Sequence, residues 1–380
     1  MELVRNEDQE LIAKTAADFV KEKSPIARVR ELRDTNDATG YSPALWKEMA
    51  ELGWVGIAFS ESLGGAGLGF AELVVVLEEL GRTLAPEPFL STVLLAGQTL
   101  LQSDDEARKQ AWIPRVSKGE AILALAQQEA GSRYALSAVS TRAERAGTGF
   151  RLQGEKIQVL DGHVADALVV VARTSGEERD EGGITLFWVP KDAAGLTVTR
   201  QSRVDGRNAA LVTLDGVEVG AGAVLGPVDG GHALLERAVD RATVGLVAEM
   251  LGGMQQAFAM TLEHLKSRQQ FDVPIGSFQA LKHRAANVFI ELELAKSTVM
   301  AAARAVDAEA PDLAKLVSLA KARCSDAYLL TANEGVQMFG GVGMTDEYDI
   351  GFYMKRARAA ELSLGDAAFH RARWASLSGY

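Results

Sequence analysis

Residues 231–267 read GHALLERAVDRATVGLVAEMLGGMQQAFAMTLEHLKS, with no proline in the run. As one helix this stretch would be about 55 Å long, at about 1.5 Å per residue. A helix of that length needs neighbours along its side, which favours an antiparallel bundle of about four helices over residues 229–380. Beyond residue 230 the chain has only two prolines, Pro274 and Pro311, and each fits a break between helices.

The region before this helix, residues 119–228, has a different period. It consists of short strand-like runs separated by Gly, Asp and Ser turns. These runs are residues 121–128, 149–160, 166–175, 183–190, 195–201 and 209–219. No helical pattern alternates with them, so an antiparallel β-barrel or sandwich is favoured over a parallel βαβ sheet.

The first part of the chain, residues 1–118, has a helical pattern. In YSPALWKEMAELGW, Ser42 suits an N-cap and Pro43 suits the first helical position. Ser103 and Glu106 stand three residues apart, which predicts a capping box.

The fold expected for the whole chain is α+β and multidomain. It has an N-terminal helical domain (1–118), a central antiparallel β-barrel or sandwich domain (119–228) and a C-terminal four-helix bundle (229–380). With 380 residues, the chain is too long for one simple core, and 47% hydrophobic residues supply enough apolar material for several.

Charge and composition exclude several classes of function. The formal net charge is −11 and no basic run occurs, so we expect neither a nucleic-acid partner nor an anionic membrane surface. The longest apolar runs are too short to span a bilayer, and acidic residues occupy the start of MELVRNEDQE, where a secretion signal would be basic. Cys324 is the only cysteine and fits a buried small side chain, so a reducing cytoplasm is expected.

Common cofactor and metal signatures are absent from the sequence. GGAGLGF, residues 64–70, lacks the glycine spacing of a dinucleotide fingerprint, and no predicted strand precedes it. The histidines have no metal-ligand spacing and no cysteine pair beside them, so no metal site is expected. They are His163, His232, His264, His283 and His370.

Four segments are informative through their order and spacing. They are GWVGIAFSESLGGAGLG (53–69), AQQEAGSR (126–133) followed by GEKIQVLDG (154–162), SRQQFDVPIGSFQALKHRAA (267–286) and GVQMFGGVGMTDEYDIGFYMKRAR (335–358). Together they resemble the acyl-CoA dehydrogenase family over nearly the whole chain. GMTDEYDIGFYMKRAR resembles the divergent small-subunit type of its heteromeric members. The resemblance implies the three-domain fold described above, FAD as cofactor and usually a tetramer.

The cofactor contacts implied by this resemblance fall mostly on the bundle. Arg268 offers a charged fork for pyrophosphate oxygens, and Phe271 offers a flat apolar face for a ring. Gln279 is implied to hold the adenosine end of FAD across a subunit interface. A further strip is implied to carry the neighbouring subunit's cofactor phosphates and ribose, where glycines permit close approach to the backbone. That strip comprises Gln337, Gly340 and Gly341. Asp272 departs from the family, whose members usually have a glycine there.

The central domain departs further from the family pattern. Ser132 keeps the hydroxyl of a loop that normally touches the flavin, partly through backbone atoms. Gln158 stands where the family has a tryptophan that shields the flavin, and Leu160 stands where it has a threonine near flavin N5. FAD binding is still expected through the bundle contacts, with altered redox tuning.

The reaction implied by the family removes the α-proton of an acyl thioester while the β-hydride passes to the flavin. A carboxylate base and hydrogen-bond donors to the thioester carbonyl are therefore required. Gap-free alignment of MKRARAAELSLGD places Leu364 at the family's glutamate and Asp366 at its threonine, beside the flavin. Leu364 cannot accept a proton, but its backbone N–H can still serve as a thioester donor.

Other branches of the family place the base on the first long helix of the bundle, just before an arginine. Asp240 precedes Arg241 here, which makes Asp240 the leading candidate base, and Arg241 resembles a residue that contacts the CoA portion. A structural role for the Asp240–Arg241 pair stays open. Glu236, Glu249 and Asp366 are the alternative bases.

Two main hypotheses follow. The chain is an FAD-dependent acyl-CoA dehydrogenase that passes electrons to an electron-transferring flavoprotein, as a homotetramer. Alternatively, it is a degenerate, non-catalytic or half-catalytic subunit of a heterotetramer whose paralogous chain supplies the base. A third hypothesis keeps the flavin and uses oxygen as acceptor, but no residue favours it. The retained bundle residues favour flavin binding in either main case.

Overall fold

The computed structural model describes residues 4–380, and these form two compact units. The bundle unit comprises the chain up to Asp34, Gly69–Ala85 and Thr243–Tyr380; the sheet unit comprises Thr35–Leu68 and Pro86–Ala242. Residues 1–3, on which the expectation about the N-terminal start partly rests, lie outside the described residues.

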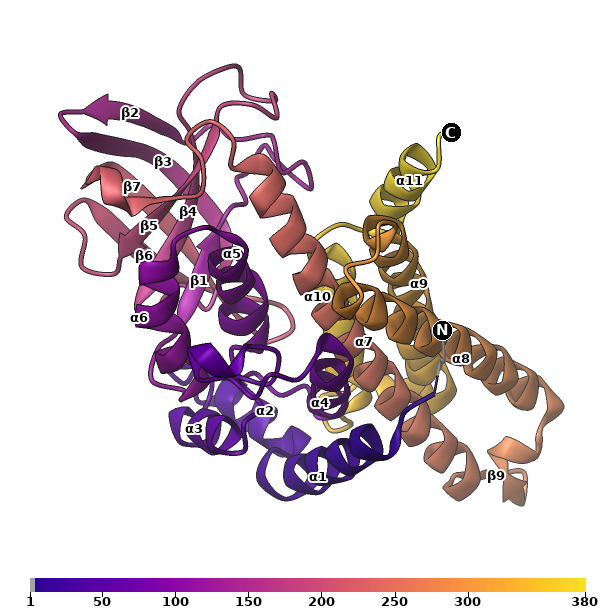
Figure 1. Cartoon of the computed structure of the whole chain (residues 1–380). Coiled ribbons are helices and arrows are strands. Elements are labelled where there is room, and N and C mark those ends of the chain that lie inside the picture. The colour runs from indigo at the N-terminus through magenta and orange to yellow at the C-terminus, as the bar shows by residue number, and fades with distance from the viewer. Residues whose placement is uncertain (1–3) are drawn as a thin grey trace. The chain divides into compact units, whose positions relative to one another are not determined.

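The bundle unit is built from helices (Figure 1). They are α1 (Glu7–Lys23), α2 (Ile26–Asp34), α4 (Phe70–Arg82), α7 (His232–Ser267), α8 (Gln279–Asp307), α9 (Leu313–Phe339), α10 (Ile350–Leu362) and α11 (Ala367–Leu377). The predicted single long helix is confirmed as α7, whose first residues, up to Ala242, belong to the sheet unit. Pro274 lies in a hairpin after α7, and Pro311 lies between α8 and α9, so both prolines separate helices as predicted.

Two glycines allow α4 and α7 to pack backbone against backbone. A Cβ atom on Gly81 would lie 2.2 Å from the carbonyl oxygen of Glu249, and one on Gly252 would lie 1.7 Å from that of Glu78. Only residues without a side chain fit at such a crossing, because any Cβ would overlap the opposite backbone.

The sheet unit contains one eight-stranded sheet together with short helices (Figure 1). The helices are α3 (Pro43–Glu51), α5 (Gly97–Gln102), which continues a π-helical segment (Phe89–Ala96), and α6 (Glu106–Ser117). The strands are β1 (Leu123–Ala126), β2 (Arg142–Ala146), β3 (Gly149–Leu160), β4 (Ala167–Arg173), β5 (Ile184–Pro190), β6 (Leu196–Ser202), β7 (Asn208–Val219) and β8 (Val224–Leu225).

All six predicted strand runs form strands of this sheet, whose order is β6-β7-β3-β2-β4-β5-β8, with β1 beside β4. The central β domain is thereby confirmed, and most of its strand pairs are antiparallel, although β2 also makes one parallel pairing with β4. The β1–β4 pair is nevertheless parallel, which is possible because the long β2–β3 hairpin lies between these two strands in sequence. The strand β2 was not predicted, because its sequence RAERA is polar and largely exposed.

Of the two predicted helix caps, one is confirmed and one is wrong. The Ser42 hydroxyl accepts a hydrogen bond from the Leu45 amide at 3.2 Å, so it caps α3 as predicted. The predicted Ser103–Glu106 capping box is wrong: Asp105 caps α6 by accepting from the Arg108 amide at 2.9 Å. The Ser103 hydroxyl instead donates to the Leu100 carbonyl at the end of α5.

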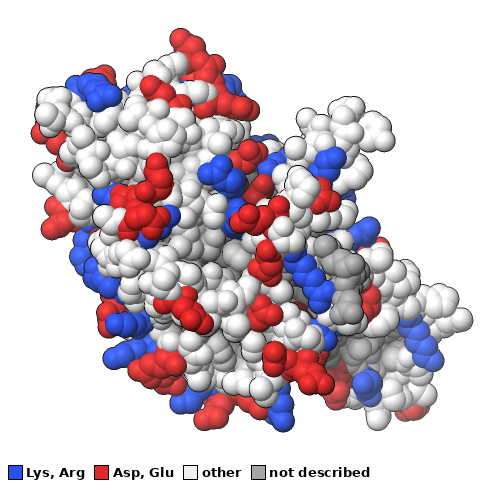
Figure 2. Space-filling view, in the orientation of Figure 1, with Lys and Arg blue, Asp and Glu red and all other residues white. Residues whose placement is uncertain are grey.

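Surface charge and apolar content set the remaining constraints. On the face drawn in Figure 2, acidic and basic side chains are interspersed. Within residues 4–380, no helix has both the length and the apolar character needed to cross a membrane. Cys324 is fully buried on α9, and burial raises the pKa of its thiol to about 12, so the thiol is an inert core side chain as predicted.

Candidate functional site

A two-stranded hairpin connects α7 to α8 and presents Phe271 to solvent. Strands β9 (Gln269–Gln270) and β10 (Val273–Pro274) pair antiparallel, leaving Phe271 and Asp272 as a two-residue turn. Both turn residues have positive φ values, 56° and 62°, as a type I′ turn requires. Asp272 thus adopts a backbone conformation that a glycine would also adopt. The turn is therefore preserved although aspartate stands where a glycine is usual. The Phe271 side chain is 86% exposed at the tip.

Two uncommitted polar side chains flank this hairpin. Arg268 ends α7 with its amide donating to the His264 carbonyl at 2.9 Å, and its side chain is exposed. Gln279 is the first residue of α8 and is also exposed. Neither side chain has an intramolecular hydrogen bond or ion pair in the described part of the chain, which leaves a guanidinium and a carboxamide available to a polar or anionic ligand.

The end of α9 presents bare backbone. Gly340 ends the helix with φ 70°, and its amide donates to the Gln337 carbonyl. An added Cβ on Gly340 or on Gly341 would meet nothing within 4 Å. A ligand can therefore approach this backbone closely, and the exposed Gln337 carboxamide lies one turn before it. The donor set and the open backbone fit a cofactor diphosphate.

A ring stack joins α7, one turn before Arg268, to the last residue of α9, which precedes the glycine strip. The His264 ring lies 4.1 Å from the Phe339 ring, with an interplanar angle of 13°. Burial and the nearby Arg268 guanidinium lower the pKa of His264, so the ring stacks in its neutral form. Phe339 also makes an edge contact with Tyr348. Sequence reasoning missed His264; its only signal was its position one helical turn before Arg268.

The turn between α10 and α11 holds Leu364 in a left-handed conformation. Its φ is 57°, and Gly365 follows with φ 109°. The buried His370 donates from Nε2 to the Leu364 carbonyl at 2.9 Å. The Leu364 amide has no backbone acceptor within residues 4–380. The turn therefore has a fixed carbonyl and an uncommitted N–H.

A buried lysine donates hydrogen bonds to the backbone of the same turn. Lys321 on α9 donates to the carbonyls of Glu361 at 2.9 Å and Gly365 at 2.6 Å, and to the Ser325 hydroxyl at 3.2 Å. Burial lowers the pKa of Lys321 to about 8. Asp366 begins α11 and accepts from the Phe369 amide at 2.8 Å, so at least one of its oxygens serves as a helix cap.

In the sheet unit, the loop that carries Ser132 is anchored by a buried ion pair. The Glu129 carboxylate lies 2.5 Å from Lys156 Nζ and accepts from the amides of Ser140 and Thr141 at 2.7 and 3.0 Å. Burial opposes its ionisation, but Lys156 and the hydrogen bonds lower the pKa of Glu129 overall. The Ser132 hydroxyl donates to the Glu129 carbonyl at 2.9 Å, so its proton is used within the loop.

Gln158 and Leu160 lie at the end of β3. Gln158 occupies a bulge with φ 52° and is exposed, whereas Leu160 is buried. The next residue, Asp161, was missed by sequence reasoning. It is 3% exposed, accepts from Ser91 Oγ at 2.6 Å, and its pKa is raised by burial. The signal was an acidic residue directly after the apolar end of a predicted strand.

The candidate bases are divided between the two units. Asp240 and Arg241 lie in the part of α7 that belongs to the sheet unit, and Asp240 is buried at 8% exposure. Glu236 lies one turn before Asp240. Glu249 belongs to the bundle unit, where it forms an ion pair with Arg356 at 3.0 Å. Arg268, Phe271 and the glycine strip thus belong to the bundle unit, whereas Ser132, Gln158 and Leu160 belong to the sheet unit.

Comparisons with known proteins find similarity along most of the chain. Sequence profiles described as acyl-CoA dehydrogenase N-terminal, middle and C-terminal domains match residues 6–120, 123–217 and 229–376, respectively. A curated relative, acyl-CoA dehydrogenase FadE27 of Mycobacterium tuberculosis, is 32% identical over 330 residues, covering 85% of this chain and 84% of that protein.

Solved structures show the same similarity. Butyryl-CoA dehydrogenase from Megasphaera elsdenii superimposes with a TM-score of 0.92 at 25% identity, covering 100% of both chains. A chain of the ChsE4-ChsE5 complex from Mycobacterium tuberculosis superimposes with a TM-score of 0.89 at 29% identity, covering 100% of this chain and 99% of that one.

Proposed function

Because this chain belongs to the acyl-CoA dehydrogenase family, whose members are flavoprotein oxidoreductases acting on CH–CH groups, we propose that it binds FAD and dehydrogenates an acyl-CoA thioester between its α and β carbons. Electrons would pass to an electron-transferring flavoprotein. The observation that carries the proposal is the open backbone at Gly340 and Gly341, which follows the Phe339 ring stacked on His264 of α7.

The residues of the bundle unit would hold the cofactor. Arg268 supplies a guanidinium for diphosphate oxygens, and Phe271 supplies a flat face for a ring. The exposed Gln279 and Gln337 carboxamides supply donors and acceptors for ribose or adenine. Ser132, Gln158 and Leu160 would line the flavin through backbone and apolar contacts, and Asp366 would lie beside it. When bound, FAD supplies the hydride acceptor.

Thioester binding and removal of the α-proton would be carried out by side chains and a backbone amide of this chain. The uncommitted Leu364 N–H would donate to the thioester carbonyl as negative charge develops there. Asp240 would take the α-proton, and Arg241 would contact the CoA portion. The burial of Asp240 supports this role, because a buried carboxylate is shielded from bulk water.

The second candidate function is that of a degenerate subunit in a heteromeric dehydrogenase. Leu364 in place of a carboxylate supports it, as do Gln158 and Leu160 near the expected flavin position. One solved relative comes from a complex named for two chains, ChsE4 and ChsE5. Exposed apolar side chains on α8 support an oligomer with a second copy or a paralogous chain. They are Phe289, Ile290 and Leu294, with exposures of 52%, 54% and 46%.

Purification of the chain alone tests the proposal. A yellow protein whose flavin absorbance bleaches on addition of an acyl-CoA supports the autonomous dehydrogenase. A protein that becomes yellow only when co-expressed with a paralogous chain supports the degenerate subunit. A chain that binds no flavin in either preparation contradicts both.

The assignment of the base has its own matched pair of variants. Asp240→Asn should abolish bleaching without releasing flavin, because it removes the charge and preserves the shape. Glu236→Gln, one turn away, should leave bleaching intact. Full activity of Asp240→Asn would remove Asp240 from the mechanism.

We also place the protein in the cytoplasm, as the reduced, buried Cys324 supports.

A further inference from the structure

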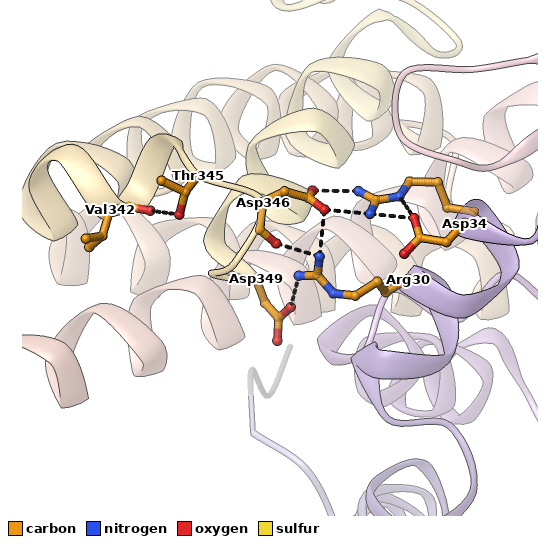
Figure 3. Close-up of polar contacts among 7 residues, drawn as sticks. Arg30, Asp34, Val342, Thr345, Asp346 and Asp349 are labelled. Carbon is orange, nitrogen blue, oxygen red and sulfur yellow. Dashed lines mark hydrogen bonds and ion pairs between the residues drawn. The ribbon is translucent and has the colours of Figure 1, made fainter.

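Two arginines of α2 hold the loop between the glycine strip and α10 (Figure 3). Arg33 forms a two-pronged ion pair with Asp346, with Nη1–Oδ1 and Nη2–Oδ2 distances of 2.6 and 2.7 Å. Arg30 Nη1 donates to the carboxylate and to the carbonyl of the same aspartate, at 2.9 and 2.5 Å. Arg30 Nη2 also donates to Asp349 at 2.8 Å. We call these four residues the α2 clamp.

An aromatic ring fixes both guanidinium groups. The central guanidinium carbons of Arg30 and Arg33 each lie 4.8 Å from the ring centroid of Phe352, which is buried on α10. Cation–π attraction and the planar carboxylate pairing restrict the two arginines to one arrangement. An isolated exposed ion pair contributes little to stability, but here the geometry is bidentate and several charges are linked.

The clamp acts on a short segment that is also held at its other end. Residues 340–349 follow Phe339, which the His264 stack fixes to α7. Within the segment, the Thr345 hydroxyl donates to the Val342 carbonyl at 2.7 Å (Figure 3). A Cβ on Gly343 would lie 2.8 Å from Phe339 Cβ, so the loop packs tightly on the helix end. The exposed Gly340–Gly341 backbone is thus held from both sides, by the His264–Phe339 stack before it and by the α2 clamp after it.

We propose that Arg30 and Arg33 are positioning residues for cofactor binding: through Asp346 and Asp349 they hold the Gly340–Gly341 backbone in the conformation that receives the cofactor diphosphate. This inference rests on the proposed function. The arginines do not neutralise the phosphates themselves, because their charges are already paired with Asp346 and Asp349 and, for Arg33, also with Asp34. Their effect on the cofactor is transmitted through the backbone of residues 340–346.

The experiment titrates FAD into deflavinated protein and measures affinity by the loss of flavin fluorescence. Arg33→Gln and Asp346→Asn should each weaken FAD binding about tenfold, and the double variant should lose no more than either single one. Arg33→Lys keeps the charge but loses the fork, so it should restore only part of the affinity. Raising salt from about 0.05 to about 0.5 M should weaken binding by the wild type more than by Arg33→Gln.

Arg151→Gln is the matched control, because Arg151 forms an exposed ion pair with Glu218 at 2.7 Å in the sheet unit. It should leave FAD affinity unchanged. Thermal unfolding of each apo variant separates affinity from general stability. FAD binding by Arg33→Gln and Asp346→Asn equal to that of the wild type would overturn the inference.

A second readout does not depend on the cofactor. Hydrogen exchange of the amides of residues 340–346 should be faster in apo Arg33→Gln than in the apo wild type, with α9 amides unchanged. Unchanged exchange in this segment would overturn the positional role. A wild type that takes up no FAD, combined with faster exchange in the variant, would instead reject the proposed function while retaining the clamp as the anchor of this loop.

Discussion

Lys321 Nζ lies 2.6 Å from the carbonyl oxygen of Gly365, so a buried cation of α9 supports the turn that presents Leu364. The same ammonium reaches the Glu361 carbonyl at the end of α10. These carbonyls lie past the last intrahelical donors of α10, and without Lys321 they would be buried and unpaired. The side chain that satisfies them also fixes the conformation of the candidate site.

Lys321→Met should destabilise the protein by about 3 kcal/mol, since it leaves buried carbonyl groups without donors. Denaturant unfolding followed by circular dichroism measures this change. Lys14→Met, at an exposed lysine of α1, is the matched control and should stay within about 0.5 kcal/mol of the wild type. Equal stabilities of the two variants would contradict the role assigned to Lys321.

His370→Gln should alter acid stability while preserving the fold at neutral pH. Burial and the Lys321 charge lower the pKa of His370 to about 3, from 6.5. Between these values the unfolded chain binds more protons, so the His370 contribution is fully present above pH 6.5 and is lost as the pH falls toward 3. Glutamine keeps a donor for the Leu364 carbonyl but does not titrate.

The measurement for His370 is the free energy of unfolding as a function of pH. The wild type should lose stability more steeply than His370→Gln between about pH 6.5 and 4. Parallel curves would show that His370 titrates in the folded protein as it does in the unfolded chain.

Gly252→Ala should weaken the packing of α4 against α7. The new Cβ would lie 1.7 Å from the Glu78 carbonyl oxygen, so the helices must separate at a cost of about 1–3 kcal/mol or more. Gly351→Ala on α10 is the control, because a Cβ there meets nothing within 4 Å. Chemical unfolding of both variants distinguishes a steric cost from the general effect of replacing glycine in a helix. No loss in Gly252→Ala relative to Gly351→Ala would contradict the crossing.

Gly341→Val should fold normally and bind FAD more weakly. A Cβ added there meets no protein atom within 4 Å, so the new side chain extends into the space expected for the cofactor. Flavin fluorescence titration should show a loss of about tenfold or more, with the unfolding temperature of the apo-protein unchanged. Undiminished affinity would place the cofactor elsewhere.

Leu364→Glu should introduce the missing carboxylate at the candidate site. Because the turn is held by Lys321 and His370, the new side chain should project where Leu364 now does, and exchange of the acyl-CoA α-proton in deuterated water should rise about 10²-fold or more. Leu364→Gln has the same shape without a base and should give no rise. Equal rates for the two variants would argue that this turn does not face the substrate.

The sequence by itself determined the local elements. The period of residues 231–267 predicted α7, the alternating runs predicted six strands, and Ser42 with Pro43 predicted the start of α3, because periodicity and caps depend on residues a few positions apart. The polar strand β2 escaped prediction because its residues face solvent and carry no apolar alternation. The Ser103 cap was misplaced because Asp105, two residues later, caps α6 by accepting from the Arg108 amide.

Only the tertiary structure decided how the candidate site is held. Lys321 and Gly365 are 44 residues apart, and Arg30 and Asp346 are 316 apart. In sequence, a buried lysine and an exposed one look alike, as do a clamped arginine and a solvated one. The difference arises from desolvation and from partners that packing brings within hydrogen-bond distance, and no local pattern of residues encodes either.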